Sequence, residues 1–302
     1  MSKQHSQPSK APETPLAARG RHTPNATITS AGVKWPLLLV LAGLIAHGNS
    51  LKADFLFDSQ RIVSNPTIKN PPSLQALLQD GQRAAVNLTL WMNYRIDQAN
   101  PRGYHLLNVI IHLMAALTLF GLLRRSLLRG KGQAHFAQSA TGIACCTALL
   151  WVVHPLTTSA VVYTIQRAES MMSLFLLLML YCLLRGDESR RSWAWNLLAI
   201  LSCAAGMGSK AVMVIAPVVA FLFDITVLSG SVQETWRRRW KVYAFLAVTW
   251  LVLFYLKTPQ GVLNPNHQGP ATVGFSCRVI TWWGYALTQP GVILHYLRLA
   301  FV

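Results

Sequence analysis

Two aspartates close together are the side chains in this chain best suited to chemistry. Asp54 and Asp58 lie in the stretch Ala-Asp-Phe-Leu-Phe-Asp-Ser. A carboxylate held among aromatic neighbours is partly desolvated, which raises its basicity and suits it to general-base catalysis. The alternative is that both aspartates are ordinary solvated loop acids.

A second group of polar residues shares one face of a predicted helix. His105, Asn108 and His112 follow at intervals of three and four residues, so their side chains project on the same side. They could bind a phosphate or a sugar, or they could form hydrogen bonds that hold helices together. No carboxylate lies on this face, so the pattern does not indicate a metal site, and the sequence indicates no cofactor.

Two later connections add charged candidates. The segment 154–169 carries His154, Arg167 and Glu169, and Lys210 lies in the short Gly-Ser-Lys turn at 208–210. Arginine can bind phosphate oxygens through two parallel hydrogen bonds. A contact between Arg167 and Glu169, and a lysine that merely extends to a membrane surface, are the structural alternatives.

The elements that position these residues are long apolar segments. The chain has 302 residues, of which 52% are hydrophobic and only 12% are charged. The apolar residues form blocks, as in membrane-spanning helices. The sequence therefore predicts an all-α fold, a polytopic membrane bundle of about eight spans. These lie at 35–51, 104–123, 137–153, 170–184, 192–208, 211–228, 242–256 and 279–297.

The basic residues between these segments alternate from one connection to the next. If the N-terminus is placed inside, the inner connections and tail hold 16 Lys or Arg and the longer outer connections hold 10. Cytoplasmic connections collect Lys and Arg. We therefore expect a cytoplasmic N-terminus and a first outer loop at 52–103. Since charge position explains the net charge of +17 and no nucleic-acid motif accompanies it, we expect no nucleic-acid partner.

Three domain-level expectations follow. Residues 1–34 are polar and basic, which predicts a disordered cytoplasmic tail, and residues 35–302 form the membrane domain. The first outer loop is rich in apolar residues, which predicts a partly helical, packed loop with a short helix after Ser73. The chain ends directly after a predicted span, and we interpret the membrane domain as incomplete at its C-terminus.

Four blocks together resemble a known family. The first runs Phe55-Leu-Phe-Asp58-Ser-Gln-Arg-Ile-Val-Ser-Asn65-Pro, and the second combines Val86-Asn-Leu-Thr-Leu-Trp-Met-Asn93-Tyr94 with Gly103-Tyr-His-Leu-Leu-Asn-Val-Ile-Ile-His112. The third joins His154-Pro-Leu-Thr-Thr to Gln166-Arg-Ala-Glu169, and the fourth is Gly208-Ser-Lys210. In order and spacing these blocks resemble a bacterial branch of the GT-C membrane glycosyltransferases. That branch is related to the protein O-mannosyltransferases and to the transmembrane and tetratricopeptide-repeat O-mannosyltransferases.

The resemblance implies an enzyme in the bacterial inner membrane that transfers a sugar from a polyprenyl-phosphate carrier. The acceptor would be a hydroxyl of a protein or glycan on the extracytoplasmic face. By this resemblance Asp58 is the catalytic base, and His154, Arg167 and Lys210 hold the carrier phosphate. We include Glu169, His105 and His112 among the expected substrate-binding residues.

The chain also departs from the family pattern at three positions. Ser59, Ser159 and Ala211 stand where the family often has acidic residues. These departures keep open a catalytically degenerate membrane scaffold. A transporter is a third alternative, although the sequence has no clear internal repeat of the kind that transporters use.

Overall fold

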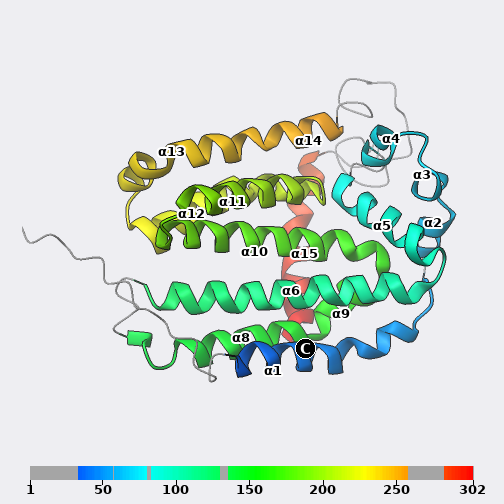
Figure 1. Cartoon of the computed structure of the whole chain (residues 1–302), viewed down its shortest axis with the longest axis horizontal. Coiled ribbons are helices and arrows are strands. Elements are labelled where there is room, and N and C mark those ends of the chain that lie inside the picture. The colour runs from blue at the N-terminus through cyan, green and yellow to red at the C-terminus, as the bar shows by residue number, and fades with distance from the viewer. Residues whose placement is uncertain (1–32, 57, 80–82, 130–134, 258–281, 302) are drawn as a thin grey trace, which may run out of the picture.

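The computed structural model describes residues 33–56, 58–79, 83–129, 135–257 and 282–301, and every regular element in these ranges is helical (Figure 1). The predicted all-helical class is thus confirmed for the described part of the chain. The expected N-terminal tail lies almost entirely outside the described residues.

The helices follow the apolar segments of the sequence. The first half contains α1 (Lys34–His47), η2 (Gly48–Lys52), α2 (Ser59–Ser64), α3 (Pro66–Lys69), α4 (Leu74–Gln79), α5 (Ala84–Asp97), α6 (Pro101–Leu127), α8 (Ala140–Val153), α9 (Pro155–Val162) and η4 (Thr164–Gln166). The second half contains α10 (Arg167–Glu188), α11 (Ser192–Met207), η5 (Ala211–Ile215), α12 (Ala216–Phe223), η6 (Asp224–Ser229), α13 (Val232–Val248), α14 (Trp250–Lys257) and α15 (Trp282–Phe301).

Helices α6 and α10 form the middle of the bundle. They pack against each other, with α1 and α8 on the α6 side and α11 on the α10 side (Figure 1). Helix α1 approaches α6 closely because Gly43 has no side chain: a Cβ atom there would lie 2.4 Å from Leu113 Cδ2. Small residues at such contacts let membrane helices pack tightly.

In the described part of the chain, fewer helices have the length of a membrane span than the sequence predicts. Four segments there are long and apolar enough: Pro101–Leu127, Thr164–Glu188, Ala211–Ser229 and Val232–Leu256. A fifth is possible if α8 and α9 count as one span, but Pro155 follows the end of α8 and the two helices are bent by 59°. Helix α1 has 14 residues and α11 has 16. The count of eight spans stays a prediction.

The segment between α1 and α6 is folded against the bundle. Helices α2 to α5 gather around the end at which α6 and α10 begin (Figure 1). Ile68, Leu77 and Leu90 are buried there in one apolar cluster with Tyr104 of α6 and Met171 of α10. Ser73 Oγ accepts a hydrogen bond from the amide of Ala76 at the start of α4. The apolar side chains named here therefore pack against the bundle.

The other end of the bundle is held by a buried ionic cluster. Asp224 is fully buried, and Arg239 Nη1 donates to both of its carboxylate oxygens at 2.7 and 2.8 Å. Tyr243 Oη donates to the same carboxylate at 2.6 Å, and Arg239 also contacts Asp187 of α10. Since burying an unpaired charge is costly, these contacts fix α13 against η6 and α10.

Replacing Asp224 by Asn should destabilise the protein by about 3 kcal/mol, because it removes the carboxylate that the buried guanidinium of Arg239 contacts. The measurement is the apparent melting temperature of the detergent-solubilised protein. Arg237→Gln is the control, since 76% of the Arg237 side chain is exposed. Equal melting of both variants and the wild type would contradict the assignment.

Candidate functional site

Asp58 lies at the surface of the end formed by α2 to α5. Its side chain is exposed, as is that of Asp54, so the partial desolvation that we expected for these carboxylates is absent. The backbone amide of Asp58 donates a hydrogen bond to the Tyr163 hydroxyl at 3.2 Å. Phe55 packs edge-to-face on Tyr104 with ring centroids 5.2 Å apart. These two contacts attach the acidic loop to the segment after α9 and to the start of α6.

Arg167, the first residue of α10, is completely buried. Its Nε donates to Asn108 Oδ1 at 2.7 Å, and its Nη1 donates to Asn93 Oδ1 at 2.7 Å and to Thr89 Oγ1 at 3.2 Å. Its Nη2 donates to the Tyr104 carbonyl at 3.0 Å. The guanidinium therefore joins α5, α6 and α10 through four neutral oxygen atoms.

This arrangement gives Arg167 a different role from the one expected. We expected a phosphate ligand or an ion pair with Glu169, but the guanidinium faces protein oxygens and has no exposed surface. The physical reason is that a buried charge needs its donors satisfied locally, and amide and carbonyl oxygens of three helices do this. In this structure Arg167 is an internal anchor.

The histidine face of α6 is also internal. His112 Nε2 lies 3.1 Å from the Val152 carbonyl, and His47 Nε2 of α1 lies 2.9 Å from the same oxygen. That carbonyl has lost its usual helical partner, because the amide of Leu156 donates to His154 Nδ1 instead. His112 also stacks on Trp151 at 4.6 Å. For His112 and Asn108 the structure thus favours the interhelical alternative over substrate binding.

His105 lies nearer the acidic loop and is almost completely buried. It lies beside the backbone of Ala53. Among the described residues neither ring nitrogen has a partner at ordinary hydrogen-bond geometry. An imidazole with unsatisfied nitrogens beneath the Asp54–Asp58 loop is suited to holding that loop, or to accepting a ligand group that enters beside it.

Lys210 and Glu169 form an ion pair across the same end of the bundle. The Lys210 ammonium contacts Glu169 Oε1, and both side chains are about one-third exposed. The amide of Ala85 at the start of α5 donates to the Gly208 carbonyl at 2.9 Å, which joins the lysine turn to the loop helices. Burial, followed by the nearby charge of Arg83, lowers the pKa of Lys210.

His154 has a local structural role that the sequence did not reveal. Its Nδ1 accepts the hydrogen bond from the amide of Leu156 at 3.2 Å, so it caps the N-terminus of α9, and its ring is half-buried. The opposite nitrogen, Nε2, is the atom of this ring that could face a ligand.

Thr89 and Tyr163 contribute to this end of the bundle but were not among the candidate site residues that the sequence indicated. Thr89 and Asn93 are four residues apart in the apolar helix α5, a spacing that places them on one face and could have indicated an internal polar contact. Nothing in the local sequence indicates that the Tyr163 hydroxyl contacts the Asp58 amide. Within the described residues no cluster of three metal-ligating side chains is formed.

The apolar helices, together with the family match that follows, place the chain in the class of membrane glycosyltransferases. Residues 85–256 match the family model described as dolichyl-phosphate-mannose-protein mannosyltransferase, and the chain belongs to that family. The match includes Arg167, its side-chain partners, Glu169 and Lys210, whereas Asp58 precedes it.

Curated relatives agree with this family. The chain is 30% identical over 198 residues to the protein O-mannosyl-transferase F38B6.6 of Caenorhabditis elegans, covering 61% of this chain and 27% of the relative. It is 26% identical to human protein O-mannosyl-transferase TMTC2, covering 70% and 27%. It is also 26% identical to Drosophila melanogaster Tmtc1, covering 85% and 33%. The chain thus spans about a third or less of these relatives, and no solved structure matches it.

The anchor assignment predicts the behaviour of Arg167→Lys. A lysine cannot satisfy four oxygens arranged around a planar guanidinium, so the variant should be destabilised by about 2 kcal/mol. The apparent melting temperature, measured without any sugar donor, reports this. Arg95→Lys on the exposed side of α5 is the control. Unchanged melting together with weakened donor binding would instead identify Arg167 as a phosphate ligand.

Proposed function

We propose that this chain is the membrane domain of a glycosyltransferase that moves a sugar from a polyprenyl-phosphate carrier to an acceptor hydroxyl. The observation that carries the proposal is the family match over residues 85–256. The acceptor is a protein or glycan on the extracytoplasmic face. The chain lies in a bacterial inner membrane through about eight spans, with the N-terminus in the cytoplasm, in line with the distribution of Lys and Arg.

The proposed reaction uses side chains at one end of the bundle. The oxygen of the acceptor hydroxyl attacks the anomeric carbon of the sugar, and the Asp58 carboxylate accepts the proton of that hydroxyl. The bond between that carbon and the carrier phosphate oxygen breaks, and the phosphate leaves with the bonding electrons. Lys210 and His154 Nε2 stabilise the negative charge on the leaving phosphate. Glu169 orients Lys210 through their ion pair.

The internal contacts give this end its geometry. Arg167 fixes α5, α6 and the start of α10, and Tyr163 holds the backbone of Asp58. His105 lies beside the Ala53 backbone of the acidic loop, and His112 stabilises the helix contact around Val152. Tyr163 and Arg167 are therefore positioning residues in this proposal, whereas Asp58 would contact the substrate.

A degenerate membrane scaffold is the second candidate function. The observation that favours it is the residue after the proposed base: Ser59 is buried, and its hydroxyl has no hydrogen-bond partner among the described residues. The related enzymes often have a second carboxylate at this position. They often also have acidic residues where this chain has Ser159 and Ala211. A scaffold would retain its membrane fold and its interactions when Asp58 is neutralised.

Asp58→Asn should abolish sugar transfer without changing membrane insertion, because the amide cannot accept the acceptor proton at neutral pH. The measurement is transfer from polyprenyl-phosphate sugars in membranes with matched expression. Asp54→Asn is the matched control, since Asp54 is an exposed acid of the same loop. Full transfer by Asp58→Asn would refute the base assignment. No transfer by the wild type across a wide donor panel would favour the scaffold.

The lowered pKa of Lys210 predicts a pH effect. Phosphate binding needs the protonated amine, so donor affinity should fall as pH rises through this lowered pKa, at a lower pH than for an ordinary lysine. Arg83→Gln removes a nearby positive charge. It should raise the pKa of Lys210 and move the alkaline loss of donor affinity to higher pH.

The measurement is the KM for the donor as a function of pH in the wild type and Arg83→Gln. Arg102→Gln removes an exposed arginine at the start of α6 and serves as the control. Identical alkaline limbs in the wild type and Arg83→Gln would exclude Lys210 as the titrating phosphate ligand.

A further inference from the structure

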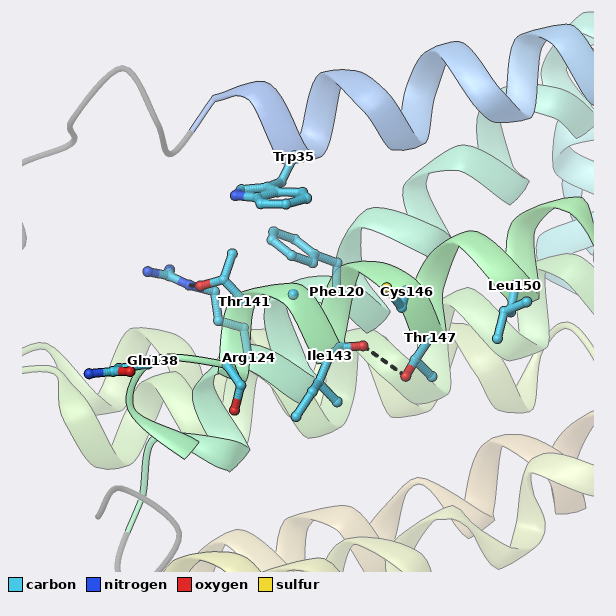
Figure 2. Close-up of a pocket in the computed structure, with 11 residues that line it drawn as sticks. Trp35, Phe120, Arg124, Gln138, Thr141, Ile143, Cys146, Thr147 and Leu150 are labelled. Atoms are coloured by element: carbon cyan, nitrogen blue, oxygen red, sulfur yellow. Dashed lines mark hydrogen bonds between the residues drawn. The ribbon is translucent and has the colours of Figure 1, made fainter. Parts of the chain in front are cut away.

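A cavity lies at the opposite end of α6 from the proposed active site. It has a volume of about 830 Å³ and is bounded by Trp35 of α1, by Phe120 and Arg124 of α6, and by side chains along α8 (Figure 2). Ser139, which directly precedes α8, and Ile143, Cys146 and Leu150 of α8 recur at intervals of three or four and so form one stripe. The proposed sugar transfer does not use this cavity.

The lining is more polar at the start of α8 than further along it, where Ile143 and Leu150 flank Thr147. Arg124, Gln138, Ser139 and Thr141 lie at one end, and Ile143 and Leu150 continue from them. The stripe from Ser139 to Leu150 extends about 16 Å at the helical rise. Ile143 is 40% exposed and Leu150 is 68% exposed, so the apolar part is open to its surroundings. A ligand that matches this lining has a polar head and a long apolar chain.

Within the described residues, no carboxylate neutralises the positive charge of Arg124 at the polar end. Arg124 Nε donates to Thr141 Oγ1 at 3.0 Å, and in the described part of the chain Arg124 forms no ion pair. Its neighbour Arg125, by contrast, pairs with Glu188 at 2.6 Å. The Lys34 ammonium lies 5.2 Å from the ring centroid of Trp35, which lines the same cavity. Two cations therefore lie at or beside the polar end.

We propose that this cavity binds an anionic phospholipid of the adjoining leaflet. The headgroup phosphate contacts Arg124, with Thr141 orienting the guanidinium and Lys34 adding attraction. One acyl chain lies along Ile143, Cys146 and Leu150. Trp35 and Phe120 close the cavity beside the headgroup, where aromatic rings are favoured at a membrane interface. The charge of Arg124 selects an anionic headgroup over a zwitterionic one.

Cys146 provides a direct readout of occupancy. It lines the cavity and is exposed, whereas Cys145, Cys182 and Cys203 are buried. The full chain in detergent is titrated with phosphatidylglycerol, with phosphatidylcholine of the same acyl chains, or with glycerol phosphate. Alkylation of the peptide containing Cys146 is followed by mass spectrometry. Each rate is divided by the lipid-free rate of the same variant, which removes effects on thiol reactivity.

Phosphatidylglycerol should protect Cys146 at concentrations about fivefold lower than phosphatidylcholine, as one cation at an anionic headgroup implies. Arg124→Gln should reduce this preference, because only Lys34 then remains beside the headgroup, and Arg124→Lys should retain it. Arg190→Gln, which removes an exposed arginine between α10 and α11, should leave it unchanged.

Four results would overturn the proposal. Equal protection by both lipids would exclude selection of an anionic headgroup, and a preference that Arg124→Gln leaves undiminished would exclude Arg124 as the headgroup ligand. Equal protection by glycerol phosphate would indicate a site for soluble anions. Protection that depends on protein concentration in the absence of lipid would show that a second copy of the chain covers the cavity.

Discussion

The architecture of the polar end depends on one buried positive charge. Moving a guanidinium out of water costs several kcal/mol unless its donors are satisfied, and Arg167 is completely buried. Asn93, Asn108, Thr89 and the Tyr104 carbonyl supply the necessary oxygens from α5 and α6. Because these acceptors belong to separate segments, the charge is tolerated only when α5, α6 and α10 are assembled.

The remaining contacts at this end extend from that assembly. Once α5 is fixed, the amide of Ala85 reaches the Gly208 carbonyl, which places the turn containing Lys210. Lys210 then pairs with Glu169, two residues after Arg167 on α10. Tyr163, just before α10, holds the amide of Asp58. An acid in one loop and a cation in another are thereby attached to the same framework, although 152 positions separate them in the sequence.

The sequence predicted the features that depend on the local pattern of apolar and polar residues. Apolar blocks located most helices, and the apolar residues of 52–103 indicated a packed segment. The role of Arg167 could not be predicted in this way, because its environment is created by residues 59 to 78 positions away. The same holds for His112, whose acceptor is a carbonyl released where α8 ends before Pro155. Helix lengths differ from the predicted spans where such breaks bend or shorten the helices.

The most direct test of Arg167 as the anchor is hydrogen–deuterium exchange in Arg167→Met. This variant removes the guanidinium N–H groups that donate to the side-chain oxygens of Asn93, Asn108 and Thr89, and it leaves an apolar side chain in their place. We predict faster exchange of the α5 amides at 84–97 and of the turn at 208–210, with α13 unchanged, since separate contacts hold that helix. Unchanged exchange in α5 would contradict the account and would mean that apolar packing alone positions this end of the bundle.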